Sequence, residues 1–178
     1  MYGLISILTR GKWKGSLAIN PGPSRVLGID PGSNVTGWGV VDSARTFKPV
    51  DYGAIKLPKN RPLAERLATL YKEVRKIVVT SGANQAAVEG VFMSKNWLSA
   101  LKLGEARGAI LAALADEGME IFEYSPAEVK KTVTGYGRAD KEQVREMVLV
   151  LLGLKERMVL DTSDALAVAI THSMLRSK

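Results

Sequence analysis

The chain has 178 residues, 46% of them hydrophobic and 24% charged, which predicts one globular domain with a real core and argues against a disordered or fibrous protein. Its 25 basic and 18 acidic residues give a net charge of +7, which favours a polyanionic partner such as nucleic acid. Because it has no cysteine and no apolar run long enough to span a bilayer, a disulfide framework, a thiol nucleophile, a thiolate zinc site and a membrane span are excluded, and we expect a cytoplasmic protein.

The first 24 residues differ from the rest of the chain in composition, being rich in glycine, proline and basic residues. Four bases and no acid fall within residues 1–25, so the remaining 153 residues carry a net charge of only +3. This concentration weakens the argument from charge to nucleic acid. We expect residues 1–24 to be a flexible basic extension, or the product of a mis-assigned start codon, and residues 25–178 to form the folded domain.

The hydrophobic pattern predicts three strands followed by alternating helices and strands. In chain order these are strands at 25–30, 35–42 and 50–57, a helix at 62–80, a strand at 85–90, a helix at 96–117, a strand at 121–124 and helices at 126–133, 140–152 and 162–175. Such an order predicts a single α/β domain in which a mixed sheet is covered by helices.

Four acidic residues stand in otherwise apolar surroundings. Asp30 ends the first strand, Glu89 lies in the fourth, and Asp161 and Asp164 open the last helix. Burying a carboxylate is costly unless a cation or hydrogen-bond donors compensate it. Each acid also has an ordinary interpretation. Asp30 can simply begin a turn, Glu89 can face solvent from an edge strand, and the two helical acids can cap their helix.

Taken together, the four acids predict a metal site. The first strand of a meander is commonly central and the fourth tends to pair with it, which brings Asp30 beside Glu89. Residues three apart share one face of a helix, so Asp161 and Asp164 can point at the same spot. Four converging carboxylates repel one another unless cations neutralise them, and hard oxygen ligands suit Mg²⁺ or Mn²⁺. Such a cluster can hold two ions on a phosphodiester, with acids inside and bases outside, as a metal-dependent nuclease requires.

Four blocks of the sequence carry a family resemblance. They are Gly28–Ser33 (GIDPGS), residues 89–96 (EGVFMSKN), residues 99–108 (SALKLGEARG) and residues 161–172 (DTSDALAVAITH). In order and spacing they resemble the RuvC-type Holliday-junction resolvases of bacteria, from about residue 25 to about residue 173. The resemblance implies a ribonuclease-H-like fold, with a three-strand antiparallel meander plus two parallel strands in a five-stranded mixed sheet. It also implies a homodimer that makes paired, symmetric incisions in four-way DNA junctions with Mg²⁺ or Mn²⁺, in recombination and repair.

The resemblance also implies roles for single residues and a partner. The family's four catalytic acids match Asp30, Glu89, Asp161 and Asp164. Phe92 matches an aromatic residue that contacts bases opened near the crossover. Lys130 and Lys141 match basic residues that contact DNA around the site. Family members work with a branch-migration motor of the RuvA and RuvB type, so we expect such a motor as a partner.

The residues themselves leave other interpretations open. Phe92 can instead pack in the core. A basic group flanks a Gly-rich turn whose backbone can approach phosphates, although the same group can form a solvated helix face; its members are Lys130, Lys131, Arg138, Lys141 and Arg145. His172, the only histidine, lies about 16 Å along the helix from Asp161, so we expect a structural role for it.

Three rival functions also remain open from the sequence. A related nuclease of the same fold could act on RNA or on other branched DNA, because the acids alone do not choose the substrate. Gly28–Ser33 followed by a hairpin resembles the phosphate-binding start of sugar-kinase or actin-like ATPases, but that fold needs two such domains and a longer chain. A junction-binding protein that does not cut would keep the basic surface without any need for four metal-ready acids.

Overall fold

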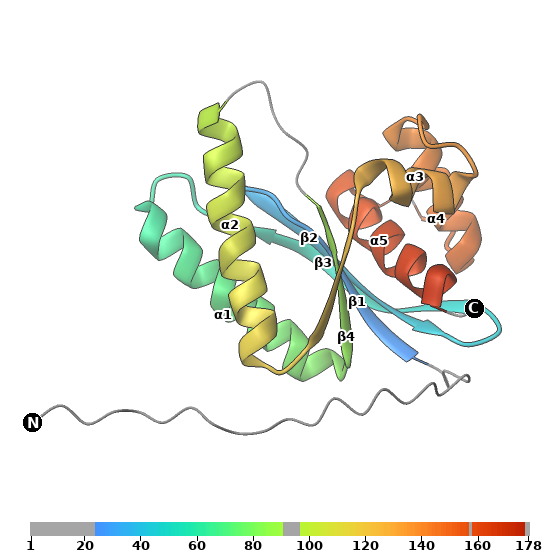
Figure 1. Cartoon of the computed structure of the whole chain (residues 1–178), viewed down its shortest axis with the longest axis horizontal. Helices are drawn as coiled ribbons and strands as arrows, with labels where there is room; N and C mark the ends of the chain where they lie inside the picture. The colour runs from blue at the N-terminus through green and yellow to red at the C-terminus, as the bar shows by residue number, and fades with distance from the viewer. Residues whose placement is uncertain (1–23, 91–96, 157, 177–178) are drawn as a thin grey trace, which may run out of the picture.

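A computed structural model of the chain describes residues 24–90, 97–156 and 158–176, and within them a five-stranded mixed sheet forms the middle layer (Figure 1). Its strand order is β3-β2-β1-β4-β5. The strands are β1 (Ser24–Asp30), β2 (Val35–Ser43), β3 (Phe47–Lys56), β4 (Gln85–Glu89) and β5 (Glu120–Tyr124). Strands β1, β2 and β3 form an antiparallel meander, whereas β4 pairs parallel with β1 and with β5. The predicted sheet is confirmed.

The first described strand begins one residue before residue 25, where we expect the folded domain to start. Strand β1 already includes Ser24, whose hydroxyl lies 3.4 Å from that of Ser43 on β2. The rest of the extension that we expect, residues 1–23, lies outside the described residues.

Helices cover both faces of the sheet (Figure 1). One face carries α1 (Leu63–Ser81) and α2 (Trp97–Asp116); the other carries α3 (Pro126–Thr134), α4 (Lys141–Leu152) and α5 (Leu160–Arg176). Alternation along β1 separates two cores, because Val26 packs with α5 whereas Leu27 and Ile29 pack with α1 and α2. Asp30 is an even-numbered residue of the same strand, so its side chain leaves the sheet on the α5 face.

Strand β3 begins at Phe47, three residues before the predicted start at residue 50. Phe47 pairs with Ser43, so the hairpin between β2 and β3 is shorter than the sequence pattern indicated. Pro49 lies next to a bulge at Val40 and Val41, on a strand at the edge of the sheet. Edge strands and bulges tolerate the missing N–H of proline, which is why a residue that disfavours a strand does not end this one.

Helix α5 lies directly on β1 and β2 because glycines leave room for it. A Cβ atom at Gly28 would lie 2.1 Å from the Ala165 carbonyl oxygen, and one at Gly37 would lie 1.8 Å from the Asp161 carbonyl oxygen. Side chains at either place would push the helix away from the sheet. Gly37 is the register partner of Asp30, so this close packing fixes the first turn of α5 beside the end of β1.

Helix α5 is buried almost all round, from Thr162 to Ser173 apart from Asp164. Three layers of a small domain account for that burial, since the sheet covers one side and α3 and α4 pack against α5 as well. Among the described residues, no helix has both the length and the apolar character that a membrane crossing needs.

Candidate active site

Asp30 and Glu89 lie side by side at the ends of two central strands. The parallel register pairs Ile29 of β1 with Val88 of β4, so the residues that follow each of them are neighbours. A side-chain hydrogen bond joins the two carboxyl groups. The interpretation in which Glu89 faces solvent from an edge strand is wrong, because β4 lies between β1 and β5.

The electrostatics of this pair favour one shared proton. Burial, the charge of Glu89 and the charge of Asp164 raise the pKa of Asp30 to about 8. Burial also raises the pKa of Glu89, while the hydrogen bond with Asp30 lowers it. Ionising both carboxyl groups at once is therefore unfavourable, and the pair favours one proton held between Asp30 and Glu89.

The turn after Asp30 is held by Thr36 and by a close approach at Gly32. The buried Thr36 hydroxyl donates to the Gly32 carbonyl oxygen at 3.1 Å and lies 3.3 Å from the Gly32 amide nitrogen. A Cβ atom at Gly32 would lie 1.8 Å from the Val35 carbonyl oxygen. The predicted turn therefore forms, but the Asp30 side chain is directed to Glu89 and has a role besides starting that turn.

Asp164 joins the pair from helix α5. Its charge raises the pKa of both Asp30 and Glu89, and its side chain is only 13% exposed. Asp161 lies one turn earlier, and its carbonyl oxygen packs against Gly37. The interpretation in which Asp161 caps the helix is wrong, because the carbonyl of Val159 already accepts the first helical bond, from the Ser163 N–H.

Two lysines bring positive charge to the acids. The Lys141 ammonium lies 2.6 Å from Oδ2 of Asp164, and this pairing raises the pKa of Lys141. Lys141 and Lys130 each lower the pKa of Glu89, so both are close enough to act on it. Lys141, one of the two residues that the family resemblance assigns to DNA contacts, thus contacts the acid cluster, and its side chain is 61% exposed.

The carboxylates fit divalent cations in their chemistry. In the parts of the chain that the structure describes, no three acidic or histidine side chains are already gathered around one ion position. Lys141 pairs with Asp164, and Asp30 and Glu89 bind each other, so these contacts stand in for a cation. Oxygen donors of this kind suit Mg²⁺ or Mn²⁺. Burial, and after it the charges of Glu89 and Asp164, raises the pKa of Asp30, and a bound cation would offset that negative charge.

The other predicted DNA contacts show no interaction with the acids among the described residues. Phe92 lies outside the described residues. Arg138 is exposed in the turn between α3 and α4. Arg145 is buried and its guanidinium pairs with Glu142, so its inclusion in the basic surface group is wrong. The sequence pattern did not predict this, because charged residues occur on more than one face of α4 and only the packing shows which face is buried.

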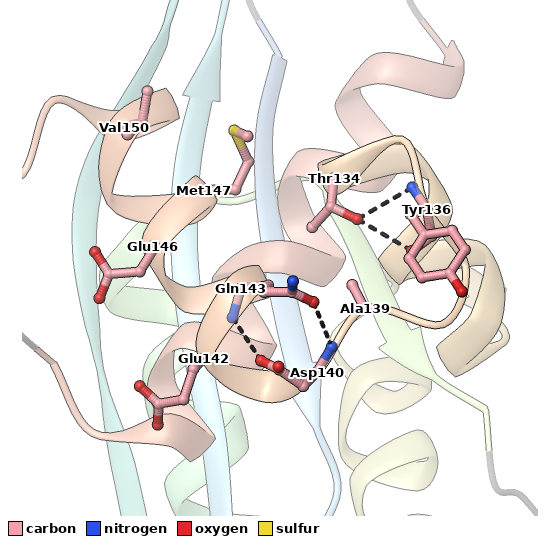
Figure 2. Close-up of a pocket in the computed structure, with 9 residues that line it drawn as sticks. All are labelled: Thr134, Tyr136, Ala139, Asp140, Glu142, Gln143, Glu146, Met147 and Val150. Atoms are coloured by element: carbon pink, nitrogen blue, oxygen red, sulfur yellow. Dashed lines mark hydrogen bonds between the residues drawn. The ribbon is translucent and has the colours of Figure 1, made fainter.

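A cavity of about 510 Å³ lies between the α3–α4 turn and the outer side of α4, and none of the four candidate catalytic acids lines it (Figure 2). Tyr136, Met147 and Val150 give it apolar lining, and Asp140, Glu142 and Glu146 add acidic groups. A cavity lined by apolar and acidic residues is not suited to a phosphate backbone. The candidate active site is therefore the acid cluster, not this cavity.

His172 lies near the far end of α5 from the acids, in the core. Its Nδ1 is 2.8 Å from the Tyr124 hydroxyl and its Nε2 is 3.1 Å from Oε1 of Gln85, and the ring packs on Phe122 with centroids 4.5 Å apart. Burial lowers the pKa of His172 to about 4, so the ring is neutral near pH 7. Nε2–H donates to Gln85 and Nδ1 accepts from Tyr124, contacts that agree with the structural role expected for this residue.

Two features of the site were not predicted from the sequence. The glycines of β1 and β2 hold α5 close, and their alternate spacing at Gly37 and Gly39 was a signal that was available. Arg66 of α1 reaches the turn after Asp30, where Nη2 donates to the Ser33 carbonyl and to Oδ1 of Asn34. Nothing in the sequence distinguishes this arginine from others on exposed helix faces.

Comparison with known proteins finds relatives along most of the chain. The family model described as "Crossover junction endodeoxyribonuclease RuvC" matches residues 26–172. Proteins of that name from Magnetococcus marinus and Chromohalobacter salexigens are each 47% identical, over 84% and 85% of this chain and 84% and 81% of their own lengths.

Solved structures agree with this match. The structure titled "T. thermophilus RuvC in complex with Holliday junction substrate" has a TM-score of 0.82 at 34% identity, over 86% of this chain and 95% of that one. The yeast mitochondrial Holliday junction resolvase Ydc2 has a TM-score of 0.63 at 13% identity, over 85% of this chain and 78% of its own, which is a likeness of fold alone.

Proposed function

The chain belongs to the RuvC family of crossover junction endodeoxyribonucleases, and we propose that it resolves four-way DNA junctions by paired, symmetric hydrolysis of phosphodiester bonds at its acid cluster. The observation that carries this proposal is the meeting of Asp30, Glu89 and Asp164 where the central strands β1 and β4 end. A phosphodiesterase of this kind acts in homologous recombination and in DNA repair. Under this proposal Asp161 completes the group from the first turn of α5.

The chemistry follows from the side chains that surround the scissile bond. The four carboxylates would hold two Mg²⁺ or Mn²⁺ ions, which supply a nucleophile from water and stabilise the leaving oxygen. Asp30 and Glu89 hold their positions because each ends a strand in the centre of the sheet. Lys141 and Lys130 would bind phosphate oxygens of the same DNA, since Lys141 contacts Asp164, the charge of Lys130 acts on Glu89, and neither lysine is buried.

Replacement of one acid separates cutting from binding. Asp30→Asn keeps the size of the side chain but removes the carboxylate, so cleavage of a synthetic four-way junction should be lost while the affinity for that junction is kept. Asp51→Asn on β3 is a matched control, because Asp51 is exposed and distant in the sheet from Asp30. Equal loss of binding and cleavage in Asp30→Asn would favour a structural role for the acid. Tight binding without cleavage by the unaltered chain would favour a junction-binding protein.

We also infer a homodimer that forms through the exposed apolar side of α2. Trp97, Leu98 and Leu101 are 71%, 49% and 54% exposed. A four-way junction presents two equivalent strands, and a two-fold axis gives each strand one active site. Leu101→Lys should therefore yield a monomer by sedimentation and single nicks in place of paired ones. Val79→Lys, at a 69% exposed residue of α1, should leave the dimer intact. A dimer that survives Leu101→Lys would contradict this interface.

Further partners and contacts follow from family membership alone. We propose that the protein acts in the cytoplasm with a branch-migration motor of the RuvA and RuvB type. Phe92 would contact opened bases, and Arg138 would bind backbone phosphate from its exposed turn. The partner is tested by whether the purified motor binds a junction that this protein already holds. The phosphate contact is tested by whether Arg138→Gln weakens binding of this protein to the junction.

A further inference from the structure

A second polar site lies at the turn that follows Asp30. There the β1–β2 turn, α1 and α2 enclose a cavity of about 190 Å³. We call it the Arg66 cavity and define it by its polar lining residues Ser33, Asn34, Arg66, Ser99 and Lys102. Leucines and one alanine complete the lining, and no acidic residue takes part in it. The cavity is therefore lined by two cationic side chains, two serines and one asparagine, and by no negatively charged residue.

Arg66 is held in place at this cavity by the turn itself. Its Nη2 donates to the Ser33 carbonyl and, at 3.0 Å, to Oδ1 of Asn34. Its Nε–H is buried and has no acceptor among the described residues. Leaving a buried donor of a charged group without an acceptor is costly. The guanidinium is therefore positioned and charged, with donor capacity that the described residues do not use.

Helices add two further features that favour an anion. Lys102 of α2 supplies a second cation, and its side chain is exposed at the cavity mouth. Leu63, the first residue of α1, also lines the cavity, and no side chain caps that end of the helix. Free amide donors at a helix start add partial positive charge. Arginine with a fixed fork, a lysine and a helix start together match a phosphate group.

We propose that the Arg66 cavity binds one backbone phosphate of the DNA strand that is cut at the acid cluster, with Arg66 and Lys102 as its ligands. This inference rests on the proposed function, because the phosphate belongs to junction DNA. Ser33 follows Asp30 by three residues, a stretch of at most about 10 Å. That reach corresponds to roughly three base steps of about 3.4 Å each. The contact therefore holds the strand a few nucleotides from the scissile bond.

The test pairs one lysine with one phosphate. Junctions that carry a single uncharged methylphosphonate linkage, moved along the six linkages around the cut, are bound to the full chain and to Lys102→Gln in the presence of chelator. With the unaltered chain, one linkage near the cut should weaken binding by about tenfold. In Lys102→Gln the effect of that same linkage alone should shrink to the part that Arg66 supplies, and the slope of log affinity against log salt should become shallower by about 0.9.

Lys48→Gln provides the matched control, because Lys48 is an exposed lysine at the opposite end of the sheet, where it pairs with Asp42. It should keep the response to every linkage. Undiminished sensitivity at all six linkages in Lys102→Gln would overturn the proposal, and so would a shallower salt slope without a change at any one linkage. Failure of the proposed function would look different. The unaltered chain would then cut no junction with either metal, while the binding comparison would still decide the cavity.

Discussion

Replacing Gly37 with alanine should separate the first turn of α5 from the sheet and slow cleavage far more than it weakens junction binding. The added Cβ atom would lie 1.8 Å from the Asp161 carbonyl oxygen and 2.4 Å from its carbonyl carbon. Ordinary contact begins at 3.4 Å, so the two backbones must part by about 1.6 Å. A misplacement of about 1 Å in catalytic groups can cost roughly 100-fold in rate, and overpacking of a core about 1–3 kcal/mol in stability.

Single-turnover cleavage of a four-way junction, with affinity measured separately in chelator, is the assay for this variant. We expect a rate at least about 100-fold lower with affinity nearly unchanged. Gly53→Ala is the matched control, since a Cβ at this β3 glycine comes no closer than 3.2 Å to the Trp38 ring, which can give by a few tenths of an ångström. A folded Gly37→Ala protein that cuts at the unaltered rate would refute the claim that close packing of α5 positions the acids.

Two further predictions concern stability and pH. The pKa of His172 in the folded protein is about 4, below the ordinary value of 6.5, so on the order of 3 kcal/mol of folding stability is lost as the pH falls from 6.5 to about 4. In urea unfolding, the stability of His172→Gln should therefore depend less on pH over this range, and an unchanged pH dependence would contradict the prediction. Hydrogen bonds of 2.7 and 2.8 Å from Arg25 lower the pKa of Asp42. Asp42→Asn should therefore lower the free energy of unfolding by about 1 kcal/mol at pH 7, and by almost nothing at a pH that protonates Asp42 in the unaltered chain. An equal loss at pH 7 and pH 2 would contradict this.

The elements of the fold were predictable because their patterns are long and regular. The helix at α1 has apolar residues at helical spacing, and its observed start at Leu63 is one residue from the predicted one. Gly82 ends it in the left-handed conformation, with φ of 65°, as a glycine after a helix commonly does. The early start of β3 was not predictable, because Pro49 argues against a strand until its edge position is known.

The relative placement of the acids was predictable where it depended on topology and was not predictable where it depended on packing. A central first strand beside the fourth was enough to bring Asp30 next to Glu89, and the register confirms that pairing. The ion pair of Lys141 with Asp164 joins residues 23 apart in the chain, and it depends on how α4 lies against α5. Arg145 shows the same limit, since its burial follows from that packing and not from the charges around it.

Junction resolution is tested by incubating the purified chain with a mobile synthetic four-way junction and a matched linear duplex, in Mg²⁺, Mn²⁺ or chelator. We expect paired nicks at symmetric positions on the junction alone, with no cleavage in chelator. Cutting of RNA hybrids in place of junctions, or tight junction binding without cleavage in either metal, would contradict it.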